Sequence, residues 1–142
     1  MEQITIEDFI KRLCNSIETL KQEHSYFAFV LIAIGIEFLG ACMDTRSWTD
    51  SRLSKKRFNH AIQEFPTLKQ YKSTKLYKYL RCGMCHVATP TCPLRLSNGS
   101  GVYNPKDNIL YIEDFYNDFR AACEHLISNP KLWGKGKMLS DI

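Results

Sequence analysis

Apolar residues recur at steps of three and four positions along three stretches of the chain, with polar residues between them. This spacing places the apolar side chains on one face of an α-helix. It predicts amphipathic helices over residues 5–21, 53–65 and 113–128, the second of which stops before Pro66. The residues that carry the pattern are Ile6, Phe9, Ile10, Leu13, Ile17 and Leu20, then Leu53, Phe58, Ile62 and Phe65, then Phe115, Phe119, Ala122, Cys123 and Leu126.

One further stretch is apolar on every side. Residues 26–42 read YFAFVLIAIGIEFLGAC, and they predict a central helix over residues 25–43 with Ser25 as its N-cap. The run is shorter than the ~20 residues that span a bilayer and it contains Glu37, so it is interpreted as a helix buried in the protein core. Because a buried carboxylate without a partner is costly, Glu37 is expected to have one.

The middle of the chain predicts a fourth helix, which begins near Thr67 or is capped at Ser73 and ends at His86. Leu76, Tyr77 and Leu80 give this helix an inward face. Three lysines spaced three residues apart are expected on a neighbouring ridge of the same helix. They are Lys72, Lys75 and Lys78.

Short apolar segments with turn residues between them follow this helix. Asn98-Gly99 is typical of a tight turn, so residues 90–112 are predicted to form a β-hairpin-like insertion. Residues 129–142 are expected to be a loosely held tail. The predicted fold class is all-α: one domain over residues 1–142, an up-and-down bundle of about five helices with a short β-hairpin-like insertion before the last helix.

Charge is distributed unevenly along the chain. The net charge is +4, but residues 52–95 hold ten basic residues and one acid, Glu64, so this segment is +9 and the rest of the chain is −5. Such a segment favours a polyanionic partner such as nucleic acid, and Lys72, Lys75 and Lys78 are its predicted phosphate contacts. The competing interpretation is a solvated lysine-rich face.

The start of the chain and its cysteines indicate a reducing compartment. The first eight residues are acidic where a secretory signal is basic, and no apolar signal core follows them, so we expect a cytoplasmic protein without a membrane partner. Cys14, Cys42 and Cys123 fall in apolar helical patterns. They are therefore expected to be buried free thiols, not a disulfide framework.

Three interpretations compete for the segment that begins at Arg81. Cys82-x-x-Cys85-His86 has the spacing of covalent c-type haem attachment. The same residues with Cys92 have the ligand types and number of a tetrahedral zinc site. The third interpretation pairs Arg81 with His86 and needs neither a metal nor a cofactor.

In this third interpretation the chain resembles the HEPN superfamily, whose R-x4-6-H motif it matches at Arg81 and His86. Residues 76–86 (LYKYLRCGMCH) are similar to that family's LRNxLxH segment, although Cys82 stands where many members have a polar residue. The resemblance implies a helical bundle that forms a homodimer, with two motifs facing one cleft, and metal-independent cleavage of RNA. It further implies a toxin or defence role, with an antitoxin or another protein as partner.

The residue types suit that reaction. A histidine such as His86 can take the proton from an RNA 2′-hydroxyl or donate one to the leaving oxygen, while Arg81 stabilises the charge on the phosphorane. Glu37 is expected to orient Arg81 and His86. On an ideal helix, residues five apart point about 140° from each other, so convergence requires a break near Gly83 or a dimer.

Two non-catalytic alternatives remain at this point. Arg81 can serve structurally by forming an ion pair with Glu37, and His86 by hydrogen bonding at the helix end. The protein is then a helical module that binds nucleic acid or a protein partner through its basic surface.

Overall fold

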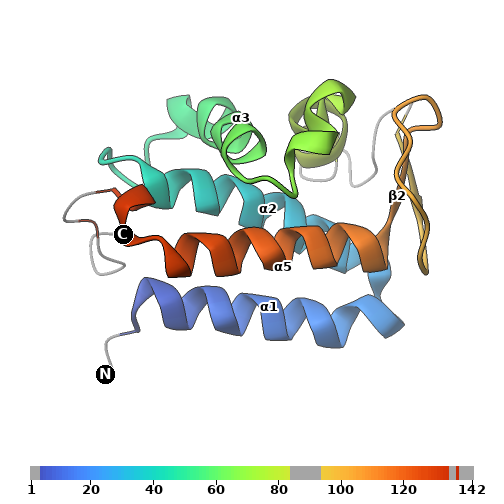
Figure 1. Cartoon of the computed structure of the whole chain (residues 1–142), viewed down its shortest axis with the longest axis horizontal. Helices are drawn as coiled ribbons and strands as arrows, with labels where there is room; N and C mark the ends of the chain where they lie inside the picture. Colours follow the sequence, from blue (N-terminus) through green and yellow to red (C-terminus); the bar gives the residue numbers. More distant parts are fainter. Residues whose placement is uncertain (1–3, 84–93, 135–136, 138–142) are drawn as a thin grey trace.

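The computed structural model describes residues 4–83, 94–134 and 137. In this part of the chain, four α-helices make up the bundle: α1 (Ile6–Glu23), α2 (Ser25–Met43), α3 (Ser54–Glu64) and α5 (Ile112–Ser128). Helix α2 is central because it contacts α1, α3 and α5 (Figure 1). The all-α fold class is confirmed, and each of these helices begins and ends within two residues of its predicted bounds.

Helix α2 forms the core, as predicted, with Phe29, Ile32 and Ile36 fully buried. Its burial is incomplete on one side, where Phe27 is 59% and Ile34 is 47% exposed. By length and composition α2 also fits a membrane span, and 56% of its most apolar window is buried inside the bundle. The free cysteines predicted at Cys14, Cys42 and Cys123 are present and buried.

The helix starts follow local hydrogen bonding. The Thr5 side chain accepts a hydrogen bond from the backbone N–H of Asp8 and caps α1. The predicted N-cap at Ser25 is wrong, because Ser25 is already the first residue of α2 and His24 precedes it. The Ser25 hydroxyl instead hydrogen-bonds the Asn98 side chain, so it links α2 to the β insertion.

The predicted fourth helix is not a continuous α-helix. It is divided into a 3-10 helix, η2 (Lys69–Thr74), and a π-helix, η3 (Tyr77–Cys82). Lys75 separates them with φ 54°, a left-handed conformation that stops a right-handed helix. Gly83 itself has right-handed helical torsions. Residues 84–86 lie outside the described residues.

The predicted insertion contains strands, but they do not form a hairpin. Strands β1 (Arg95–Ser97) and β2 (Ile109–Tyr111) pair in parallel, with Arg95 opposite Ile109. Because a two-residue turn can join only antiparallel strands, Asn98-Gly99 does not close the pair. The chain continues past Gly99 and turns at residues 104–108, so that β2 begins next to the start of β1 and runs in the same direction. The two strands stand at one end of the bundle (Figure 1).

The described part of the predicted loose tail is packed against the bundle. A 3-10 helix, η4 (Pro130–Leu132), follows α5, and Trp133 Nε1 donates a hydrogen bond to Leu126 O. Gly134 N donates to Cys42 O, and Lys137 Nζ lies 2.6 Å from Ala41 O. The contacts of Gly134 and Lys137 cover the C-terminal end of α2, and that of Trp133 covers the C-terminal end of α5, where backbone carbonyls lack helical partners.

Helices α2 and α3 approach closely at Gly40. A Cβ atom on Gly40 would lie 1.9 Å from the carbonyl oxygen of Arg57, whereas one on Gly35 would meet the far end of the Phe119 ring at 2.5 Å. We expect Gly40→Ala to lower the free energy of unfolding by about 1–3 kcal/mol, and by more than Gly35→Ala, because a backbone atom yields less than a side chain.

Both substitutions gain the same helix propensity within one helix, so Gly35→Ala is a matched control. Urea unfolding of the two variants measures the difference. An unchanged or raised stability of Gly40→Ala would contradict the close helix contact.

Candidate nucleic-acid interface

Glu37 of α2 is half-buried, with 25% of its side chain exposed, and lies at the centre of a polar cluster. Its Oε1 atom forms an ion pair with Arg81 Nε at 3.0 Å and accepts a hydrogen bond from Ser54 Oγ at 2.5 Å. Tyr77 OH donates to Ser54 Oγ at 3.0 Å. The four residues come from α2, α3 and η3, so the cluster fixes the π-helix against the two longer helices.

Arg81 is held in place but is not sealed from solvent. Its side chain is 22% exposed, and its guanidinium carbon lies 5.7 Å from the centre of the Tyr77 ring. In a π-helix the hydrogen bonds run between residues five apart, and such turns are frequent at functional sites. The wide turn of η3 therefore presents Arg81 beside Tyr77 with its orientation fixed by Glu37.

Tyr77 also lines a groove between α3 and the η2–η3 segment. This groove, called the lysine groove below, has a volume of about 400 Å³. It is lined by Lys55, Asn59, Ile62, Gln63, Lys72, Lys75, Tyr77 and Lys78. Among the described residues, no acidic side chain forms an ion pair with any of its four lysines.

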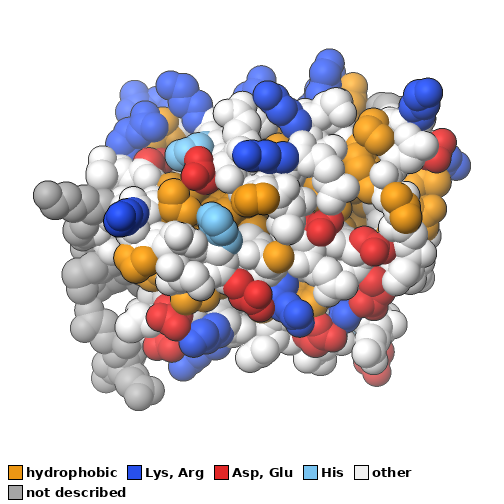
Figure 2. All heavy atoms as spheres, in the orientation of Figure 1, with side chains coloured by type: hydrophobic (Ala, Val, Ile, Leu, Met, Phe, Trp, Pro, Cys, Tyr) orange, Lys and Arg blue, Asp and Glu red, His pale blue; other side chains and the backbone are white. Residues whose placement is uncertain are grey.

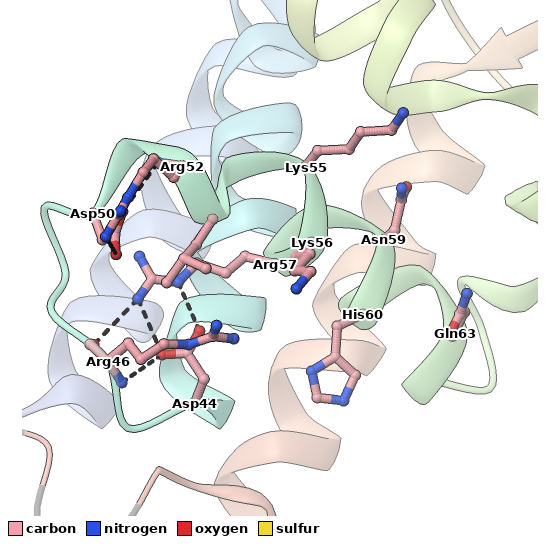
Figure 3. A pocket seen from close by; sticks show the side chains of 11 residues that line it. Asp44, Arg46, Asp50, Arg52, Lys55, Lys56, Arg57, Asn59, His60 and Gln63 are labelled. Atoms are coloured by element: carbon pink, nitrogen blue, oxygen red, sulfur yellow. Dashed lines mark hydrogen bonds and ion pairs between the residues drawn. The ribbon is translucent and has the colours of Figure 1, made fainter.

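A second groove lies on the other side of α3, between that helix and the loop at residues 44–53. This loop groove has a volume of about 910 Å³ (Figure 3). It is lined by Asp44, Arg46, Asp50, Arg52, Leu53, Lys55, Lys56, Arg57, Asn59, His60 and Gln63. Lys55, Asn59 and Gln63 line both grooves.

Arg57 holds the loop that borders this groove. Its guanidinium group is buried and donates to Asp44 through Nε at 2.7 Å and Nη2 at 3.0 Å. It also donates to the carbonyl oxygens of Arg46, Ser47 and Trp48. The N–H donors of one guanidinium group therefore hold the turn of the loop in place.

The acids of the loop groove are already neutralised. Burial alone would raise the pKa of Asp44, but hydrogen bonds from Arg57 and Lys137 outweigh it and lower the pKa to about 2. Asp50 is paired with Arg52 at 3.1 Å, and this hydrogen bond lowers its pKa. Arg46 and Lys56 have no acidic partner among the described residues, so the groove has a net positive field.

The space-filling view shows the charge separation that the sequence predicted. Lys and Arg side chains gather along one edge of the molecule, over α3 and the η2–η3 segment, while acids lie mainly over the lower half of this face (Figure 2). The exposed cations of α3 and of the η2–η3 segment therefore form one basic surface.

The structure brings together most of the residues that the sequence singled out. Lys72, Lys75 and Lys78 line one groove although they do not share a regular helix, and Arg81 pairs with Glu37. His86 lies outside the described residues. Sequence patterns missed Ser54, Lys55 and Tyr77 as members of the site, and only the position of Tyr77 four residues before Arg81 hinted at one of them.

The metal and haem interpretations concern residues that the structure covers only in part. Cys82 is half-buried with a free thiol, while Cys85, His86 and Cys92 lie outside the described residues. Within the described ranges, no group of three or more Cys, His, Asp or Glu side chains has the geometry to hold a metal ion. Cys82 therefore belongs to no such group in that part of the chain.

Comparisons with known proteins give no independent guide to these grooves. No protein-family model, no curated protein and no solved structure matches the chain. What the surface binds must therefore be inferred from its own shape and charge.

Proposed function

We propose that this protein binds RNA through the lysine groove. The observation that carries the proposal is the groove itself: four lysines, which pair with no acid in the described part of the chain, line one cavity together with Tyr77. Lysines are the common contacts to phosphate oxygens, and aromatic rings stack on unpaired bases. The same combination of a basic groove and a ring is typical of surfaces that hold single strands.

The solvated-face alternative accounts less well for the groove. Lysines on a merely solvated face have no reason to converge on one cavity, whereas those at residues 55, 72, 75 and 78 come from three elements and meet there. Lys75 does so from a left-handed backbone conformation that is unusual for lysine. Convergence from separate elements favours a ligand with several negative charges.

Paired substitution of Lys72 and Lys75 by Gln tests this function. We expect affinity for a single-stranded RNA to fall on the order of tenfold at about 50 mM salt, because two phosphate contacts are lost. The slope of log K against log salt should become shallower by about 1.4, or 0.7 for each contact. Fluorescence anisotropy titrations at several salt concentrations measure both quantities.

The control is the variant with Lys106→Gln and Lys131→Gln, which removes two exposed lysines outside both grooves. It lowers the net charge by the same amount and should keep the wild-type affinity. Equal losses in the two variants would show a general charge effect and would contradict binding in the lysine groove.

Cleavage of the bound RNA is a second candidate function, and one observation favours it. Arg81 contacts Tyr77, which also lines the lysine groove, so a guanidinium with a fixed orientation stands beside the proposed RNA path. Arg81 is the first residue of the HEPN-like R-x4-H motif, with His86 as its partner. In this proposal Glu37 positions the guanidinium, and cleavage follows the metal-independent route through the RNA 2′-hydroxyl.

The remaining parts of the HEPN-like proposal are its biological setting and assembly. A homodimer in which two motifs face one cleft would place Arg81 and His86 of both copies near one strand. A cytoplasmic toxin or defence protein with a dedicated protein partner is the role that such an enzyme would fit.

A further inference from the structure

The two grooves lie on either side of one row of α3 side chains. Lys55, Asn59 and Gln63 are four residues apart, so they form a ridge about 12 Å long on the helix surface. Figure 3 shows these three side chains in sequence along α3. Each of the three lines both the lysine groove and the loop groove. The ridge is therefore a border that the two grooves share, and a ligand that fills both must pass over it.

No unpaired acid interrupts this route among the residues that line it. Asp44 is bound by Arg57 and Lys137, and Asp50 is bound by Arg52. The ridge contributes one cation and two amide side chains, which can bind phosphates as donors and base edges as donors or acceptors. A polyanion therefore meets no net negative charge between the lysine groove and Arg46 or Lys56.

The far groove offers its own contacts. Arg46 and Lys56 supply positive charges, and His60 is an exposed ring beside them, of the kind that stacks on unpaired bases. The loop that carries Arg46 is fixed by the buried Arg57, so ordering it on binding costs little entropy.

From the shared polar ridge and the paired acids beside it we infer that a single RNA strand crosses α3 and occupies both grooves at once. The ligand is then an extended single strand and not a short end or a mononucleotide. The inference rests on the proposed RNA binding and extends it from the lysine groove to the loop groove. It predicts that affinity depends on strand length.

Two strands of about 4 and about 16 nucleotides, a range that covers known single-strand site sizes, provide the test. The loop-groove variant carries Arg46→Gln and Lys56→Gln. We expect it to bind the long RNA on the order of tenfold more weakly than wild type, with a salt slope shallower by about 1.4. The short RNA should lose less than about threefold, because the lysine groove remains a complete site for it.

The Lys106 and Lys131 double variant is again the matched control for charge, and thermal unfolding checks that all variants are folded. If the loop-groove variant binds the long RNA as well as the control does, or weakens both RNAs equally, the crossing path is overturned. The Lys72 and Lys75 variant then decides the proposed function separately. If the Lys72 and Lys75 variant still loses affinity as predicted, RNA binding in the lysine groove stands although the crossing path does not.

Discussion

Purified protein is expected to cleave single-stranded RNA in excess EDTA, and His86→Ala is expected to slow this cleavage by about 10²–10⁴-fold, the usual contribution of a general acid or base. Arg81→Lys should lower the rate by about 10²–10³-fold. This substitution keeps a positive charge beside Glu37 but loses the planar fork that matches a phosphorane. Single-turnover assays on an end-labelled strand measure the rates.

Two controls separate catalysis from binding and folding. The same strand with 2′-O-methyl groups should bind but remain intact, because the nucleophile is blocked. Both variants should unfold at the wild-type temperature and keep the wild-type RNA affinity, because the proposal assigns Arg81 and His86 to the cleavage step and not to binding. No cleavage by wild type above the His86→Ala background at high protein concentration would remove the catalytic candidate and leave RNA binding alone.

The largest expected effect on stability is at Arg57. We expect Arg57→Ala to lower the free energy of unfolding by about 3–5 kcal/mol, because breaking a buried ion pair leaves a partly buried charge and unpaired polar groups. Asp44 keeps its contacts with Lys137 and with the backbone N–H of Arg46, but it loses both guanidinium hydrogen bonds. The carbonyls of Arg46, Ser47 and Trp48 lose the same donor. Urea unfolding monitored by Trp48 and Trp133 fluorescence measures the change.

Arg52→Ala is the matched comparison for this prediction. Arg52 also pairs with an aspartate of the same loop, but its side chain is 88% exposed, and exposed pairs contribute about 0–1 kcal/mol. Arg57→Lys should be less destabilising than Arg57→Ala, because lysine keeps the positive charge beside Asp44. It should not restore full stability, because lysine cannot make the hydrogen bonds to the loop carbonyls. Equal destabilisation by Arg57→Ala and Arg52→Ala would contradict the role of Arg57 in fixing the loop.

Some features of this protein were predicted correctly from short-range pattern. The bounds of α2 followed from an apolar run, and those of α1, α3 and α5 from a three-and-four spacing, because a helix depends on neighbours within one or two turns. The ion pair between Glu37 and Arg81 was also predicted, because a carboxylate within an apolar helix favours an opposite charge and Arg81 was an available cation.

The errors lie where distant contacts override local preference. Residues 67–86 have a helical pattern, but packing against α2 and α3 produces a 3-10 helix, a left-handed lysine and a π-helix within the described part of it. Asn98-Gly99 is typical of a hairpin, but its chain continues and the strands pair in parallel. The tail at Trp133 and Gly134 is held by α5 and α2, which no local pattern reveals.

For the candidate site, the order of residues alone concentrates cations between residues 52 and 95 and so sets the sign of the charge there. Folding was needed to bring Lys55 together with Lys72, Lys75 and Lys78 in one groove and to pair Asp44 and Asp50 with cations. The difference arises from the range of the forces involved. Helix formation depends on nearby residues along the chain, whereas a groove and its electrostatic field depend on side chains that only folding brings together.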